Sequence, residues 1–167
     1  MTLKSRNGKL NDEQQALSVQ VLKKFRVIYG SVRQHFREIE QTCGVSGSQL
    51  WILREVAEKP GIGVSELAER LSIHQSTCSL LVEKLVGRHL ISKERSQEDQ
   101  RRVGLRLTEN THALLAKAPG PAEGVLPDAL IGMPENVLKS LDASLGEVIK
   151  RLSAADDSYA EKPLSDL

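Results

Sequence analysis

The sequence has 167 residues, enough for one domain of ordinary size that buries a core without disulfides or a structural metal. Hydrophobic residues make up 40% and charged residues 27%, which excludes an intrinsically disordered chain. Aromatic residues make up only 3%, so we expect a core of aliphatic side chains, as in helical proteins. The net charge of +1 does not by itself suggest a nucleic-acid partner.

Two cysteines, Cys43 and Cys78, are widely separated, without C-x-x-C spacing or a neighbouring His cluster. This spacing argues against a zinc site and a disulfide framework, and the histidines are too scattered to indicate a metal. The first twenty residues lack the apolar run of a signal peptide, and no stretch approaches the roughly 18 apolar residues of a membrane span. We therefore expect a cytoplasmic protein with no cofactor, no metal and no membrane partner.

The charged residues are unevenly distributed along the chain. Residues 70–108 carry 8 Lys or Arg against 4 Asp or Glu, a balance of +4, whereas residues 109–167 carry 5 against 10, a balance of −5. Such asymmetry is typical of a phosphate-facing module attached to a scaffold that does not contact nucleic acid.

Apolar side chains recur at steps of three and four over residues 12–42, which predicts one long amphipathic helix. Gly44 is expected to end that helix. A second helix should begin at Ser46, because Gln49 stands three residues on, where a capping box requires it. This second helix should run to about Glu58.

Pro60, Gly61 and Gly63 interrupt the chain before a short third helix, which we expect Ser65 to cap. After a turn at 72–74 a fourth helix is expected, whose apolar residues fall at i, i+3, i+4 and i+7 and should be buried. These residues are Cys78, Leu81, Val82 and Leu85. The cysteine among them is thus expected to be a small core residue rather than a redox switch.

Two segments of alternating apolar and polar residues, 90–95 and 103–108, predict a β-hairpin joined by a polar loop. Thr108 is expected to cap a further helix that breaks at Pro119, and a last helix should begin at Pro134. The last helix carries apolar residues at the spacing of a helix-pairing seam. They are Leu138, Leu141, Leu145, Val148 and Leu152.

This order of elements predicts a mainly α fold with a small β-hairpin wing, that is, a winged helix-turn-helix with N- and C-terminal dimerisation helices. Two amphipathic terminal helices expose more apolar surface than one copy can cover, which favours a homodimer. We expect five parts: a flexible N-terminus (1–10), an N-terminal dimerisation helix (11–44), a winged helix-turn-helix DNA-binding lobe (45–108), a linker with C-terminal dimerisation helices (109–154), and a flexible tail (155–167).

The fourth helix carries residue types that contact the major groove of DNA. Gln pairs with adenine, Ser and Thr bond base edges or phosphate, and a helix N-terminus attracts phosphate. A lysine further along would reach the DNA backbone. The candidate DNA-binding residues of this helix are Gln75, Ser76, Thr77, Ser79 and Lys84.

The hairpin supplies a second candidate contact, because a basic tip can enter the minor groove, where Arg is favoured. The candidates are Arg95, Arg101 and Arg102. Asp99 cannot itself favour DNA, so we expect it to brace the wing through an intramolecular bond.

The segment from Val64 to Thr108 resembles the helix-turn-helix and wing of the MarR (multiple antibiotic resistance) regulators. The similarity lies in the S-E-L-A-x-x-L helix, the Q-S-T-x-S reading helix, the D-x-R wing at Asp99 and Arg101, and the closing L-x-L-T. The order of the flanking helices also fits the family. At His89 the family usually has Gly; if this residue has a positive φ, His is among the residue types that tolerate it, at some cost in strain.

The resemblance implies a homodimer that binds double-stranded DNA at a pseudo-palindromic operator and usually represses transcription. It also implies that Arg101 reaches the minor groove while Asp99 braces the wing, and that the bases are read by Gln75, Ser76, Thr77 and Ser79. A small-molecule effector that prefers a different spacing of the two reading helices would release the DNA. A candidate effector pocket is formed by His35, Phe36 and Trp51, although core packing also accounts for the two aromatic residues.

An enzyme is not expected, because the sequence contains no nucleophile elbow, P-loop, dinucleotide-binding Gly pattern or paired-His motif. The alternative to a DNA-binding regulator is a protein-interaction or structural module of the same fold that has lost DNA affinity. Two features favour this alternative: the near-neutral net charge, and Leu80 at a place where the resembling family often has a polar residue.

Overall fold

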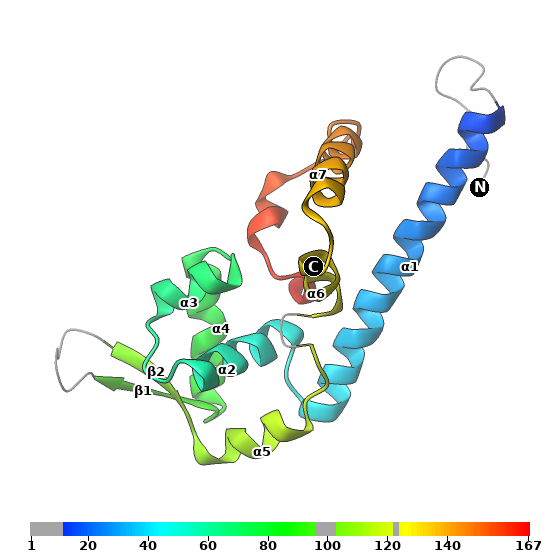
Figure 1. The fold of residues 1–167 in the computed structure, drawn as a ribbon. Helices are drawn as coiled ribbons and strands as arrows, with labels where there is room; N and C mark the ends of the chain where they lie inside the picture. Colours follow the sequence, from blue (N-terminus) through cyan, green and yellow to red (C-terminus); the bar gives the residue numbers. More distant parts are fainter. Residues whose placement is uncertain (1–11, 96–102, 122–123) are drawn as a thin grey trace.

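The computed structural model of the chain describes residues 12–95, 103–121 and 124–167. A long helix, α1 (Asp12–Cys43), runs along one side of the molecule, and a lobe of three helices and a hairpin lies beside its C-terminal end (Figure 1). The lobe consists of α2 (Gly47–Glu58), α3 (Val64–Leu71), α4 (Gln75–Gly87), β1 (Ile91–Arg95) and β2 (Val103–Leu107). The predicted mainly α fold with a hairpin wing is confirmed.

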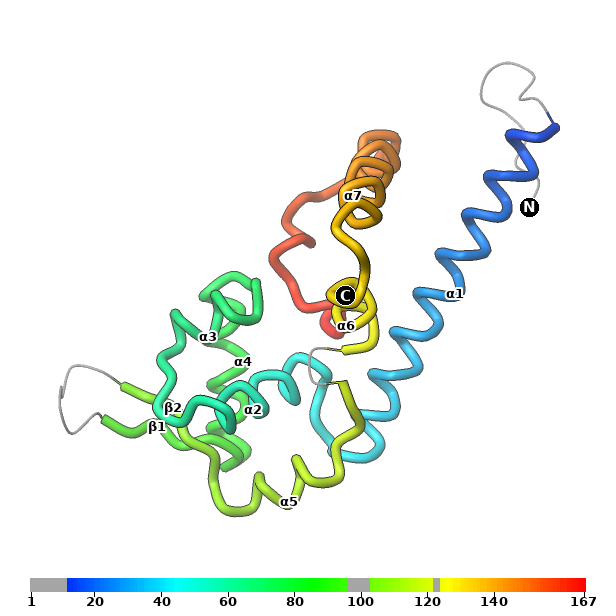
Figure 2. Tube along the Cα trace, viewed as in Figure 1, coloured from blue at the N-terminus to red at the C-terminus, as the bar shows by residue number. Residues whose placement is uncertain are grey.

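The remaining elements lead from the hairpin back toward α1. They are the helices α5 (Glu109–Lys117), α6 (Val125–Ile131) and α7 (Glu135–Ile149), followed by the 3-10 helices η1 (Asp157–Glu161) and η2 (Leu164–Asp166). Figure 2 shows that the end of the chain returns to the middle of the molecule, beside α6.

The start of α2 has the capping box that its sequence predicts. The Ser46 hydroxyl accepts a hydrogen bond from the Gln49 N–H at 3.3 Å, and the Gln49 side-chain oxygen accepts one from the Ser46 N–H at 3.1 Å. Gly44 ends α1 with a φ of 65°, a left-handed conformation that glycine adopts without steric cost. These local signals set the angle between α1 and α2.

The start of α3 differs from the expectation. The N-cap is Gly63, in an extended conformation and without a side-chain hydrogen bond, so the predicted cap at Ser65 is wrong. Ser65 lies inside the helix, where its hydroxyl is free to contact α4. The helix therefore begins after Gly63, two residues before the predicted cap at Ser65.

The lobe is held together by one aliphatic core to which α2, α3, α4 and both strands contribute. The predicted stripe of α4 is confirmed: Cys78, Leu81, Val82 and Leu85 are all buried. A second, smaller cluster of Ile39, Val45 and Leu50 joins α1 to α2. Burial of the α4 stripe fixes which face of that helix turns outward.

The hairpin is antiparallel and pairs Ile91 with Leu107 and Lys93 with Leu105. The loop before α3 adds a third backbone segment, because the Gly61 N–H donates to the Leu105 carbonyl at 2.8 Å and the Leu105 N–H donates to the Ile62 carbonyl at 2.9 Å. This loop therefore ties the base of the wing to the helices.

The two terminal helices leave their apolar residues largely uncovered. The N-terminal half of α1 extends away from the rest of the molecule (Figure 1), and its exposed apolar residues include Leu17, Val21, Leu22, Phe25 and Ile28. No residue of α7 is buried. Leu152, which we predicted as the last residue of the α7 seam, lies beyond the end of that helix at Ile149.

The segment 155–167, predicted to be a flexible tail, contains η1 and η2 and makes hydrogen bonds to α2 and to the turn before α4. The sequence pattern did not predict them because their partners are far away along the chain.

Candidate nucleic-acid interface

The N-terminal turn of α4 presents polar side chains to solvent. Because the apolar stripe turns inward, Gln75 and Ser76 are exposed, and Thr77 and Ser79 are partly exposed beside them. His74 is the N-cap: its Nδ1 accepts a hydrogen bond from the Ser76 N–H at 3.3 Å and lies 2.8 Å from the Ser76 hydroxyl. Four of the residues predicted to read bases are thus brought together at one helix end.

Gln75 is held from the neighbouring helix. Its side-chain Nε2 donates to the Ser65 hydroxyl of α3 at 3.0 Å, and both side chains are exposed. The bond ties the Gln75 amide to α3, and within the described residues its carbonyl oxygen makes no hydrogen bond to that helix. Sequence reasoning missed Ser65, which it had assigned to capping.

Further along α4 the exposed face is mixed. Lys84 is exposed, and no ion pair within the described ranges involves it. Leu80, between the polar tip and Lys84, is 65% exposed. Glu83 forms an ion pair with Lys93 of β1, which fastens the helix to the wing. Lys84 therefore carries a charge that no carboxylate of the described residues pairs with.

The wing carries further basic residues, of which only part is described. Arg95 is exposed at the end of β1, whereas the other predicted wing residues, Asp99, Arg101 and Arg102, lie outside the described residues. Arg106 pairs with Glu94 across the hairpin at 2.7 Å, an exposed contact that the sequence analysis did not predict. Such a pair can be predicted only when the register of the two strands is known, because the register decides which side chains on one face of the hairpin are neighbours.

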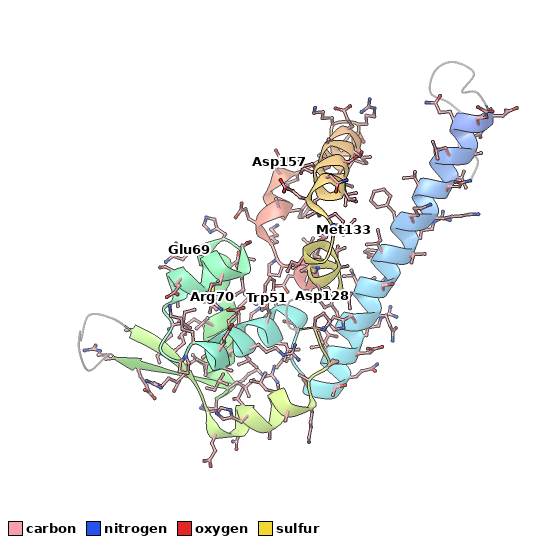
Figure 3. All side chains as sticks on the ribbon, viewed as in Figure 1. Trp51, Glu69, Arg70, Asp128, Met133 and Asp157 are labelled. Atoms are coloured by element: carbon pink, nitrogen blue, oxygen red, sulfur yellow. The ribbon has the colours of Figure 1, made fainter. Side chains whose placement is uncertain are left out.

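Ion pairs also join α3 to α2. Arg70 bonds Glu58 at 2.8 Å through its Nη2 and also pairs with Glu55 through its Nε (Figure 3). The two carboxylates raise the pKa of the Arg70 guanidinium. Because its charge is paired with two carboxylates of α2, we assign Arg70 a role in joining the helices rather than in binding a ligand.

The three residues of the candidate effector pocket do not all line one cavity. Phe36 and Trp51 border a cavity of about 50 Å³ between α1, α2, α6 and η2, and Trp51 lies on α2 at the centre of the molecule (Figure 3). His35 is buried beside Phe36, with its ring centroid 6.1 Å from that of Phe36, but it does not line this cavity.

Within the part of the chain that the structure describes, Nε2 of the buried His35 ring has no hydrogen-bond partner. Desolvation lowers the pKa of His35, more strongly than the nearby Glu38 carboxylate raises it. The neutral ring is therefore the form that the fold favours.

The described residues offer little to a metal or to thiol chemistry. No group of three or more His, Cys, Asp or Glu side chains within the described ranges is arranged to hold a metal ion. Burial raises the pKa of Cys78 to about 11, which keeps this thiol protonated. Over the same part of the chain, every helix is too short or too polar to cross a bilayer.

Comparison with known proteins gives a consistent result. The MarR family matches residues 45–103, which comprise the helix-turn-helix and the first part of the wing. The HTH-type transcriptional repressor MdtR of Bacillus subtilis is 28% identical over 84 residues, which are 50% of this chain and 54% of MdtR. The chain thus matches about half the length of this curated relative.

Solved structures share the fold over a larger part of the chain. The YusO protein of Bacillus subtilis is 18% identical with a TM-score of 0.52, over 83% of this chain and 98% of YusO. A mutant of MarR from E. coli in complex with operator DNA is 16% identical with a TM-score of 0.51, over 77% of this chain and 95% of MarR. A MarR family protein of Bacillus stearothermophilus has a TM-score of 0.50 at 19% identity, over 87% and 99% of the two chains.

Proposed function

Since residues 45–103 of this chain match the MarR family, we propose that the chain is a DNA-binding transcriptional regulator of that family, which acts as a homodimer and represses transcription from a pseudo-palindromic operator. The observation that carries the proposal is the polar N-terminal tip of α4, exposed next to a basic hairpin and backed by a buried stripe on the same helix. A helix presented in this way enters a major groove with its first turn nearest the bases.

The exposed tip divides into base-reading and backbone-positioning groups. Gln75 offers an amide that can bond adenine bidentately once it exchanges its contact with Ser65. Ser76, Thr77 and Ser79 supply hydroxyl groups beside it, and Lys84 supplies a charge for phosphate. The wing arginines Arg95, Arg101 and Arg102 are proposed for the minor groove, with Asp99 bracing the loop that carries them.

A second copy of the chain is proposed to cover the apolar residues of α1 and α7. The uncovered side chains of α1 form a stripe along its length, and Ile28 in the middle is 44% exposed. Burial of such a stripe against a twofold-related copy removes apolar surface from water. The resulting dimer presents two copies of the reading helix, related by the twofold axis. Two reading helices then address two half-sites about ten base pairs apart or a multiple of that.

Repression is the sign of regulation we propose, because the relative MdtR is named a repressor. A small-molecule effector is proposed to act at the cavity bordered by Phe36 and Trp51. As it stands this cavity of about 50 Å³ is far smaller than the pockets that hold drug-sized ligands, which measure about 300–1,000 Å³. Effector binding therefore requires part of the cavity wall to move.

The test is a fluorescence-anisotropy titration of the purified chain against DNA from upstream of its own gene, at several salt concentrations. A regulator should bind with a negative log-salt slope, because Lys and Arg displace counterions from phosphate. Arg101→Ala should weaken binding, whereas Arg70→Ala should change affinity only as far as it changes folding. No binding at low salt would remove the proposal.

The second candidate function is a protein-interaction module of the same fold. It is favoured by Leu80, whose side chain is 65% exposed in the middle of the face proposed for DNA. Leu80→Arg discriminates between the two functions: it should strengthen DNA binding by adding a phosphate contact, whereas it should abolish an interaction with an apolar protein partner.

A further inference from the structure

Residues 156–167 form a segment that we call the strap. It leads from α7 back to the helical lobe and contains η1 and η2 (Figure 2). Pro163, between the two 3-10 helices, is buried although Lys162 and Leu164 on either side of it are exposed. The strap is thus fixed at its centre by packing and has contacts on both sides of that point.

One set of contacts lies at the N-terminus of α2. The Ser48 N–H donates to the Ser165 hydroxyl at 3.0 Å, and the Ser48 hydroxyl donates to the Asp166 carboxylate at 2.9 Å. The first N–H groups of a helix have no partner within the helix, and an acidic side chain near them interacts favourably with the helix dipole. The strap therefore completes the cap of α2 from 117 residues away in the sequence.

The second contact lies at the N-terminus of α4. The His74 N–H donates to the Glu161 carbonyl at 3.2 Å. His74 is the N-cap of α4, directly before the residues proposed to read bases. One short segment thus joins the first turn of α2 to the first residue of the reading helix.

Between these two contacts the strap forms one wall of the cavity bordered by Phe36 and Trp51. Pro163, Leu164 and Ser165 line the cavity. Packing is close at this wall: a Cβ on Gly47 would lie 2.5 Å from Cδ1 of Phe36 and 3.2 Å from Cβ of Ser165. Of the segments that form the cavity wall, the strap is held to the lobe by hydrogen bonds to Ser48 and His74 and by the packing of Pro163.

We propose that the strap is an intramolecular occupant of this pocket, which closes it to apolar ligands and joins it to the start of the reading helix. A ligand that takes the place of Leu164 and Ser165 breaks the cap at Ser48 and pulls Glu161 away from His74. Closure of the pocket stands independently of DNA binding, whereas the regulatory consequence rests on the proposed function.

The test uses the full chain with Ser165→Ala and Asp166→Ala together, which removes both acceptors that the strap offers to Ser48. The matched control is Ser153→Ala with Asp142→Ala, the same two changes at exposed positions outside the strap. Trp51 is the single tryptophan of the chain, so quenching of its fluorescence by acrylamide reports access to the cavity. The quenching constant should rise by about twofold or more in the strap variant and keep its wild-type value in the control.

The second measurement tests the link to α4. Hydrogen exchange of the His74 amide should become about threefold faster or more in the strap variant, although neither His74 nor Glu161 is changed. A higher quenching constant for Trp51 with an unchanged exchange rate at the His74 amide would overturn the link between the strap and α4. Pro163→Glu, which places a charge at the buried centre of the strap, should produce both changes, and wild-type values in both variants would overturn the proposal.

A DNA titration of the wild-type chain separates this inference from the proposed function. If the wild-type chain binds no DNA, the proposed function fails, while the Trp51 and His74 measurements still decide whether the strap closes the pocket. If it binds DNA, the strap variant should change the affinity and the control should not.

Discussion

The side-chain amide of Gln75 on α4 donates a hydrogen bond of 3.0 Å to the hydroxyl of Ser65 on α3. The bond is exposed, so it costs little to exchange for a base edge, since a net protein hydrogen bond contributes about 1 kcal/mol. It ties the residue proposed for base reading to α3 before DNA arrives.

Gln75→Ala should therefore lower sequence preference more than it lowers folding stability. We expect the ratio of affinities for the operator and for a scrambled duplex to fall about tenfold, as one lost bidentate contact of about 1–3 kcal/mol implies. Lys84→Ala should weaken both duplexes about equally and reduce the log-salt slope by about 1. Equal losses of preference in the two variants, measured by anisotropy, would refute this division of roles.

Ile28→Glu should weaken the proposed dimer, because it places a charge in the apolar stripe of α1. The dimer dissociation constant, measured by sedimentation, should rise about tenfold or more. Arg26→Glu is the control, since Arg26 is exposed about 200° around the helix from Ile28. A monomeric wild-type chain at micromolar concentration would sink the dimer itself.

Gly104→Ala should destabilise the lobe. A Cβ at this position would lie 2.6 Å from the Gly61 carbonyl oxygen and 2.8 Å from the Gly61 Cα. These are backbone atoms, so the loop bridge to Leu105 must shift, at a cost of about 2 kcal/mol or more in the free energy of unfolding. In α7, a Cβ at Gly146 would have no atom within 4 Å, so Gly146→Ala should instead stabilise the protein by about 0.5–1 kcal/mol. The free energy of unfolding of both variants is measured by urea denaturation.

His89→Gly should stabilise the protein. His89 has a φ of 56°, a left-handed conformation that costs a non-glycine residue about 1 kcal/mol. His112→Gly, an exposed change inside α5, should destabilise by a few tenths of a kcal/mol through helix propensity. The same sign for both variants in thermal unfolding would contradict the assignment of strain to His89.

Stability should fall in mild acid because of His35. Desolvation lowers the pKa of this ring in the folded chain, so the unfolded chain takes up a proton first as the pH falls. The neutral ring's contribution is therefore complete above the ordinary histidine pKa of about 6.5 and is lost as the pH falls from there through the lowered folded value. His35→Leu should flatten this part of the pH–stability curve, measured by urea denaturation at several pH values.

The candidate site was predictable where its signals are local. The reading helix follows from an apolar stripe with a period of 3.6 residues, and the capping box of α2 follows from two residues three apart. The placement of Gln75 and Ser76 on the outer face is a consequence of that stripe. The contacts of Gln75 with Ser65 and of Glu83 with Lys93 were not predicted, because they depend on how α3, α4 and β1 pack.

What the sequence by itself determined is the set of elements and the outward face of α4, since hydrogen bonds and side-chain periodicity within a few residues specify both. Only the tertiary structure decided that Gly61 lies against Gly104 and that Ser165 caps Ser48. Such contacts join segments far apart along the chain, and their geometry depends on the path of every element between them. The physical reason is that a local pattern records which surface must be buried, but not which distant backbone group will meet it.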